Sequence, residues 1–300
     1  MSTVRHFLDL REVGFSELRQ ILKYSAKFKQ SKGQQSPLSG KTLAMIFEKS
    51  STRTRVSFEV AMRQLGGDVI SLKQDDLQVG RGETIADTGR VLSRYVDAIL
   101  LRTNHPDRLI ELAKYSDVPV INGLTDRSHP IQLLADILTY EDNLGSISNA
   151  RVAWCGDGNN MAFTWLQAAV EFGFELRLAC PSELELSAQE IFNAKAAGAN
   201  VFATNDPVKA VSDANCVVTD TWVSMGDDNA EWRQKLLEPF RVDEALMKHA
   251  NPDAIFMHCL PAHRGEEVSA GVLDGFQSVV WDEAENRLYA QKGILMWCLK

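Results

Sequence analysis

The feature that most constrains the fold is an alternation of short apolar runs with longer amphipathic segments along almost the whole chain. The first apolar run covers residues 42–47, and a helical pattern over about 52–65 follows it. Short apolar runs separated by helical patterns are typical of βαβ units, in which helices cover both faces of a parallel sheet. The alternation therefore predicts an α/β fold with parallel sheets.

The same alternation recurs in both halves of the chain. Further strands are predicted at 68–72, 98–101, 118–121, 151–155, 176–179, 200–203, 216–219 and 254–258, and further helices near 84–95, 106–114 and 130–143. The small, polar segment 144–149 is the best candidate for a hinge. A chain of 300 residues is longer than one small hydrophobic core usually accommodates. We therefore expect two domains, residues 1–144 and 150–281.

Composition narrows the classes of partner. The formal net charge of −8 argues against a nucleic-acid-binding surface, and no segment approaches the roughly 20 apolar residues of a membrane-spanning helix. The N-terminal segment is too short and too charged for a secretory signal, which favours a cytoplasmic protein. The five cysteines form no CxxC pair, so neither a zinc site nor a disulfide framework is predicted. An anionic ligand would need a local basic pocket.

One such pocket is predicted at residues 48–55, which follow a strand and open a helix. A helix N-terminus offers unpaired backbone N–H groups and the positive end of the helix dipole. The hydroxyls of Ser51, Thr52 and Thr54 add donors, and Arg53 adds a planar fork suited to phosphate oxygens. Each residue alone also fits a capped helix beside a solvated arginine. Together they indicate a phosphate site.

The wider segment 47–59 resembles the carbamoyl-phosphate signature of the aspartate and ornithine carbamoyltransferases, and the likeness continues to the C-terminus. The resemblance implies two doubly wound α/β domains with parallel sheets. It also implies that a C-terminal helix, at about 282–300, crosses back to the first domain. Carbamoyl phosphate would be one substrate.

Three more residues are predicted to complete the carbamoyl-phosphate site. Arg102 ends a predicted strand, where open α/β sheets present ligand groups. His129 and Gln132 stand three apart at a helix start, hence on one face, although a lone His before Pro also fits a capping or surface residue. The segment is similar to the family's H-P-x-Q motif, whose His and Gln contact the carbamoyl group. With Thr54, Arg102 and His129 would stabilise the oxyanion of the reaction.

Gln78 lies in a polar, glycine-containing loop that could be an ordinary mobile loop. In the family this loop reaches into the neighbouring subunit's site, and its aspartate-specific members typically carry a lysine there. The resemblance thus implies the ornithine branch and a homotrimer with sites between subunits.

Two loops of the second half are predicted to bind an amino acid. Residues 156–160 follow a strand, but Met161 stands where a dinucleotide-binding motif needs its third glycine. They resemble instead the family's G-D-G-N-N segment, which assigns a carboxylate contact to Asn160. Residues 220–226 resemble its D-x-W-x-S-M-G pattern. There Asp220 would bind an α-ammonium group, with Ser224 and the Met225 backbone as further contacts.

The segment His258–Pro261 is similar to the H-C-L-P motif of the ornithine branch. A buried structural cysteine is the alternative for Cys259; the resemblance implies that Cys259 and the Leu260 carbonyl direct the attacking amine. A protease-type dyad of His258 and Cys259 is not expected, because neighbouring side chains on a strand point to opposite faces. Arg287 matches the arginine that the family's E-N-R segment sends to the carbamoyl group.

The resemblance implies that L-ornithine and carbamoyl phosphate react to give L-citrulline and phosphate, a step of arginine metabolism. No metal and no organic cofactor is implied. Within the enzyme class, acylated ornithine and putrescine are the alternative amines. From another class, a nucleotide-binding or regulatory relative that lacks the chemistry is the alternative.

Overall fold

The computed structural model describes residues 4–31, 36–49, 51–76, 82–223 and 229–300. The chain divides into two compact units, one formed by Met1–Leu138 with Arg287–Lys300 and the other by Thr139–Asn286. Each unit is an α/β structure with one parallel sheet, which confirms the predicted fold class. The functional domain boundaries near 144 and 150 stay a prediction.

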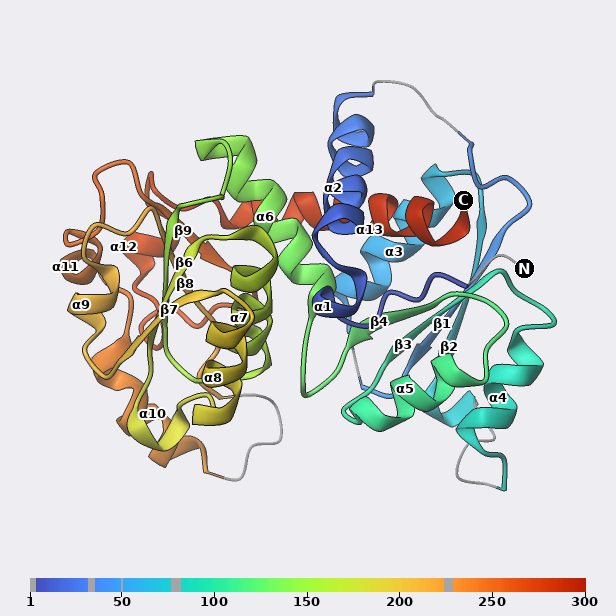
Figure 1. Ribbon diagram of the computed structural model, residues 1–300, viewed down its shortest axis with the longest axis horizontal. Coiled ribbons are helices and arrows are strands. Elements are labelled where there is room, and N and C mark those ends of the chain that lie inside the picture. The colour runs from blue at the N-terminus through green and yellow to red at the C-terminus, as the bar shows by residue number, and fades with distance from the viewer. Residues whose placement is uncertain (1–3, 32–35, 50, 77–81, 224–228) are drawn as a thin grey trace. The chain divides into compact units, whose positions relative to one another are not determined.

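The sheet of the first unit has four parallel strands in the order β2-β1-β3-β4 (Figure 1). The strands are β1 Thr42–Phe47, β2 Asp68–Lys73, β3 Ala98–Arg102 and β4 Val120–Leu124. Strands β1 and β3 are almost entirely buried, which explains their unbroken apolar sequence. Strand β4 begins at Val120 rather than at the predicted residue 118, because Pro119 has no N–H to donate to the ladder.

The helices of the first unit include the three predicted between its strands. Their bounds are α3 Arg53–Gln64, α4 Ile85–Leu92 and α5 Pro106–Lys114, and a short 3-10 turn lies at Gln74–Asp76. Helices α1 Leu10–Val13 and α2 Phe15–Gln30 precede the sheet and were not predicted. Helix α2 buries an apolar face that includes Leu18 and Ile21.

The sheet of the second unit has five parallel strands in the order β7-β6-β5-β8-β9 (Figure 1). The strands are β5 Arg151–Cys155, β6 Glu175–Ala179, β7 Asn200–Thr204, β8 Cys216–Thr219 and β9 Ile255–His258. The helices are α7 Asn160–Phe172, α8 Ala188–Ala196, α9 Pro207–Val211, α10 Ala230–Leu237, α11 Glu244–Met247 and α12 Ala270–Leu273, with 3-10 turns at Ser182–Leu184 and Glu238–Phe240. All five strands confirm predicted ones.

Two long helices carry the chain between the units. Helix α6 (Pro130–Leu144) leaves the first unit after Leu138, and helix α13 (Val280–Leu299) rejoins it at Arg287. Gly293 lets α13 approach α2 closely, since a Cβ atom there would lie 2.6 Å from the Ile21 carbonyl oxygen. The predicted return of the C-terminal helix to the first domain is therefore confirmed.

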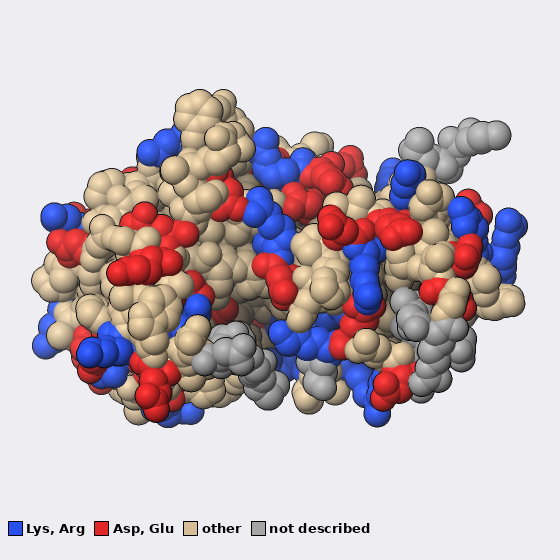
Figure 2. All heavy atoms as spheres, turned by 90° about the horizontal axis from the view of Figure 1, so that it is seen from below, with Lys and Arg blue, Asp and Glu red and all other residues tan. Residues whose placement is uncertain are grey.

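The surface mixes both signs of charge. On the face drawn in Figure 2, Lys and Arg side chains lie among Asp and Glu side chains. Among the described residues, no helix is both long and apolar enough to cross a membrane.

Candidate active site

In each sheet, the order of the strands reverses at one point. The chain runs from β1 outward to β2 and then returns to β3 on the other side of β1, and it does the same at β5 and β8. Ligands of open parallel sheets bind beyond the carboxyl ends of the strands at such a switch point. The predicted residues Ser51–Thr54 follow β1 and Arg102 ends β3, whereas Asn160 follows β5 and Asp220 follows β8. Each unit thus has its own candidate binding point.

The first turn of α3 is suited to an anion. The helix begins at Arg53, and its N-cap residue Thr52 makes no side-chain hydrogen bond to the helix. The capping alternative is therefore not supported for the Thr52 hydroxyl. Thr52 and Arg53 are exposed and Ser51 is partly exposed. The first turn of the helix thus presents backbone N–H groups, hydroxyls and a guanidinium to a ligand.

A cluster of polar side chains surrounds the Thr54 hydroxyl. Arg287 Nη2 donates to Thr54 Oγ1 at 2.8 Å, and Arg102 Nη1 donates to the same oxygen at 3.4 Å. Arg287 Nη1 also donates to Gln132 Oε1. Thr54 and Gln132 are fully buried, and Arg287 is only 4% exposed. Two guanidinium groups that converge on one buried hydroxyl bring positive charge to this point, which suits an anionic ligand.

His129 and Gln132 lie at the start of α6, as predicted. Burial, and then the positive charges of Arg287 and Arg102, hold the pKa of His129 well below its usual value of 6.5. The imidazole is therefore neutral at neutral pH and can hydrogen-bond without carrying charge. Gln132 Nε2 donates to Asp136 Oδ1 at 2.7 Å, which turns the amide oxygen toward Arg287.

In the second unit, Asn159 links the two strand ends. Its Oδ1 accepts from the backbone N–H groups of Met161 and Ala162, which caps α7, and its Nδ2 donates to Asp220 Oδ2 at 3.0 Å. The predicted contact residue Asn160 is the first residue of α7. Asn159 was missed by the sequence reasoning, although Asn before a helix is a frequent N-cap and could have been singled out as one.

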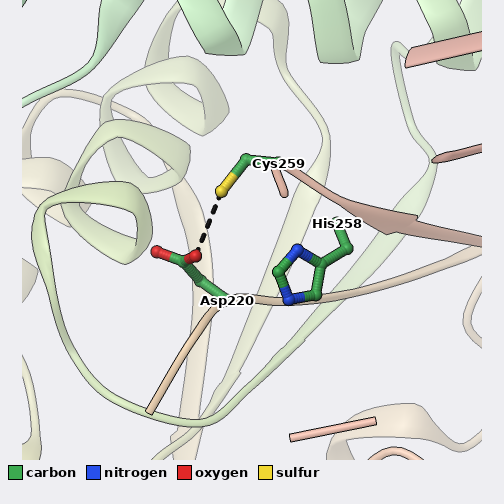
Figure 3. Close-up of side chains that lie close together, drawn as sticks. All are labelled: Asp220, His258 and Cys259. Atoms are coloured by element: carbon green, nitrogen blue, oxygen red, sulfur yellow. Dashed lines mark hydrogen bonds between the residues drawn. The ribbon is translucent and has the colours of Figure 1, made fainter. Parts of the chain in front are cut away.

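Asp220 and Cys259 come together at the ends of β8 and β9, as Figure 3 shows. The Cys259 thiol donates to Asp220 Oδ1, with Sγ 3.1 Å from the oxygen. The same oxygen accepts from the backbone N–H of Thr221 at 2.8 Å. Both oxygens of this carboxylate are thus oriented by the protein. The sequence-predicted Asp220 and Cys259 share one site.

The position of His258 corrects one expectation. The premise that His258 and Cys259 are neighbours on a strand is wrong, because β9 ends at His258 and Cys259 lies beyond it. Leu260, two residues after the strand, adopts a positive φ of 58°. Ring nitrogen, thiol sulfur and the Asp220 carboxylate lie within 4.8 Å of one another. The ring accepts from Leu260 N–H at 2.9 Å through Nδ1, and its Nε2 lies 3.2 Å from Glu267 Oε1. His258 thus orients the Leu260 backbone.

The same three side chains offer the donor atoms of a possible cation site. A carboxylate oxygen, an imidazole nitrogen and a thiol sulfur lie at a spacing that suits a divalent ion such as Zn²⁺, but both ring nitrogens of His258 already have partners, so the imidazole would have to give up Leu260 N–H or Glu267 to bind one. A search for CxxC spacing could not find this set, because Asp220 follows β8 whereas His258 and Cys259 stand at the end of β9. All five cysteines are free; Cys259 is partly exposed, whereas the other four are buried, and burial raises the pKa of Cys155 to about 12.

Three predicted site residues, Gln78, Ser224 and Met225, lie outside the described residues. The first unit brings Arg102, His129, Gln132 and Arg287 together around Thr54, and the second brings Cys259 to Asp220.

Comparison with known proteins identifies both halves of the chain. Residues 5–142 match the family model described as the aspartate/ornithine carbamoyltransferase carbamoyl-P binding domain, and residues 148–298 match the Asp/Orn binding domain of the same family. The ornithine carbamoyltransferase of Rhodopseudomonas palustris (strain BisA53) is 57% identical over 302 aligned residues, which cover 98% of this chain and 97% of the relative.

Solved structures agree with this result. The ornithine carbamoyltransferase from Pyrococcus furiosus superposes with a TM-score of 0.93 at 50% identity, covering 98% of this chain and 96% of the other. The enzyme of that name from Burkholderia thailandensis E264 gives a TM-score of 0.91 at 45% identity, covering 99% of both chains.

Proposed function

The chain belongs to the aspartate/ornithine carbamoyltransferase family, and from that premise we propose that it transfers the carbamoyl group of carbamoyl phosphate to the δ-amine of L-ornithine, giving L-citrulline and phosphate. The observation that carries the proposal is the buried cluster in which Arg287 and Arg102 donate to one Thr54 hydroxyl. The reaction develops negative charge on the carbamoyl oxygen and releases phosphate, and this cluster supplies fixed positive charge.

The donor substrate would bind at the first turn of α3. Ser51, Thr52 and Arg53 would hold the phosphate together with the backbone N–H groups of the turn. No proton has to move for this contact, since the guanidinium is always charged. Because the phosphate leaves in the reaction, the same donors would also stabilise the leaving group.

The carbamoyl group would bind at the cluster. The δ-amine nitrogen attacks the carbamoyl carbon to form a tetrahedral oxyanion, the C–O bond to phosphate then breaks, and the departing phosphate takes the amine's proton. Arg102, Arg287 and neutral His129 would donate to the carbamoyl oxygen, and Gln132 would contact the carbamoyl amide. Their donors are already oriented before the charge appears, which is the condition for transition-state stabilisation.

The acceptor would bind in the second unit. Asp220 would hold the α-ammonium group and Asn160 the α-carboxylate, with Ser224 and Met225 as further contacts. The thiol of Cys259 and the carbonyl of Leu260 would direct the δ-amine. The positive φ at Leu260 supports this role, because it is a backbone conformation that an L side chain rarely adopts without a constraint.

The choice of amine tests the function directly. The purified protein should form citrulline from ornithine and carbamoyl phosphate with a kcat/KM at least about a hundredfold above that for putrescine or N-acetylornithine. Putrescine lacks the carboxylate, and N-acetylornithine lacks the free ammonium group. A preference for putrescine would contradict the assignment, and a lack of turnover with every amine would favour a non-catalytic relative.

The pH dependence should reflect the substrate rather than His129. Because the δ-amine has a pKa near 10.4 and must be neutral to attack, log kcat/KM for ornithine should rise with a slope of about 1 between about pH 6 and 7.5, below the range in which the α-ammonium group bound by Asp220 loses its proton. His129 should add no break near 6.5, because its pKa lies well below that value in the folded protein. A break at that pH that disappears in His129→Asn would contradict this prediction.

We further propose a cytoplasmic homotrimer that serves arginine biosynthesis, in which Gln78 of one subunit completes the site of the next. In support, β2 is an edge strand of its sheet and exposes Ile70, which is 47% accessible in the isolated chain. Sedimentation equilibrium would disprove the trimer if it gave the mass of one chain, and cell fractionation tests the location.

A further inference from the structure

One arginine of the second unit joins both loops that carry the proposed ornithine contacts. Arg233 lies on α10, where its Nε donates to the carbonyl oxygen of Trp222 at 2.9 Å and its Nη2 forms an ion pair with Asp157. Asp157 belongs to the loop between β5 and Asn160, and Trp222 follows Asp220 at the end of β8. A single guanidinium therefore connects the two sides of the β5/β8 switch point.

Both acceptors of Arg233 are themselves fixed. The carbonyl oxygen of Asp157 accepts from Trp154 Nε1 at 2.9 Å. The side chain of Trp222 is 2% exposed, and the guanidinium of Arg241 lies 5.9 Å from the centre of its ring. Each loop is thus held by its own contacts, at Asp157 in one and at Trp222 in the other. We therefore expect a substitution of Arg233 to change the position of the two loops relative to each other rather than to unfold either loop.

The chemistry of the contact requires arginine. A planar guanidinium can address a carboxylate and a carbonyl oxygen at once, whereas lysine offers a single charged nitrogen on a flexible stem. The side chains of Arg233 and Asp157 are only 19% and 15% exposed, so water screens their attraction less than that of a surface pair. We infer that Arg233 is a positioning residue that sets the affinity for ornithine, an inference that rests on the proposed function.

The test is Arg233→Gln in the full-length enzyme. The KM for ornithine should rise about tenfold, as expected for the loss of a hydrogen bond to a charged group. The kcat and the KM for carbamoyl phosphate should change less than about twofold, because the first unit is untouched. Arg233→Lys should recover part of the affinity. Adding Asp157→Asn to Arg233→Gln should cost less than the two single effects combined.

Arg177→Gln is a matched control in the same unit. Arg177 is 15% exposed, pairs with Glu175 at 2.6 Å and donates to the carbonyl oxygen of Ser212. It therefore loses the same kinds of contact on substitution. Glu175 begins β6, so this pair lies away from the carboxyl ends of the strands, and the KM for ornithine should stay unchanged.

Binding without turnover separates affinity from chemistry. L-norvaline has the α-amino and carboxylate groups of ornithine but lacks the δ-amine, and its dissociation constant in the presence of carbamoyl phosphate should also rise about tenfold in Arg233→Gln. An active wild-type enzyme whose Arg233→Gln variant behaves like Arg177→Gln would overturn the inference alone. An inactive wild-type protein would instead overturn the proposed function.

Discussion

Replacing Arg287 by glutamine is expected to lower kcat for citrulline formation by about a hundredfold to a thousandfold, the usual effect of removing one preoriented oxyanion donor. Arg287 is almost fully buried and donates to both Thr54 and Gln132. Glutamine keeps an amide donor but removes the charge. Steady-state kinetics at saturating carbamoyl phosphate measures the loss.

Arg63→Gln is the control for this variant. Arg63 forms an exposed ion pair with Glu59 on α3, with side chains 60% and 38% accessible, and such pairs contribute little to stability. Its kcat should match that of the wild type. Thermal unfolding of both variants shows whether Arg287→Gln remains folded. A folded Arg287→Gln protein with a kcat within about threefold of wild type would remove Arg287 from the proposed mechanism.

The strands could be predicted because the sequence of each strand alone shows the apolar pattern that its burial requires. A strand buried on both faces needs an unbroken apolar run, as in β1 and β3. Helix α2 was missed because its start lacks a polar cap: the N-cap residue is Gly14, which makes no side-chain hydrogen bond. The start of β4 was misplaced because the apolar run continues through Pro119, whose carbonyl oxygen accepts from Ile99 but which has no N–H to donate to the ladder.

The site could be predicted only where it follows directly from the strand ends. Arg102, Asp220 and Cys259 all stand at or just after the carboxyl end of a strand, and within each sheet parallel strands bring such positions to the same edge. Asn159 and Asp220 are 61 residues apart, and Arg233 and Asp157 are 76 apart. Neither pair has a spacing that reveals it, because the packing of whole elements decides which side chains meet.

Asp220→Asn should produce the largest change in acceptor recognition. The variant keeps an oxygen for the Cys259 thiol, the contact now made at 3.1 Å, but it loses the charge proposed to hold the α-ammonium group. We expect kcat/KM for ornithine to fall about a hundredfold, the effect of leaving a desolvated charge without its partner. The KM for carbamoyl phosphate should stay the same, because its proposed contacts lie in the other unit.

A second acceptor substrate shows whether Asp220 binds the α-ammonium group or only holds neighbouring side chains in place. 5-Aminopentanoate keeps the δ-amine and the carboxylate of ornithine but has no α-amino group. If Asp220 binds the ammonium, Asp220→Asn should reduce turnover of ornithine far more than turnover of 5-aminopentanoate. Equal losses for both would assign Asp220 to holding Cys259 and Asn159 in place. Asp274→Asn, which breaks an exposed pair with Arg264, should affect neither substrate, so a selective loss in Asp220→Asn reflects the acceptor's ammonium group itself.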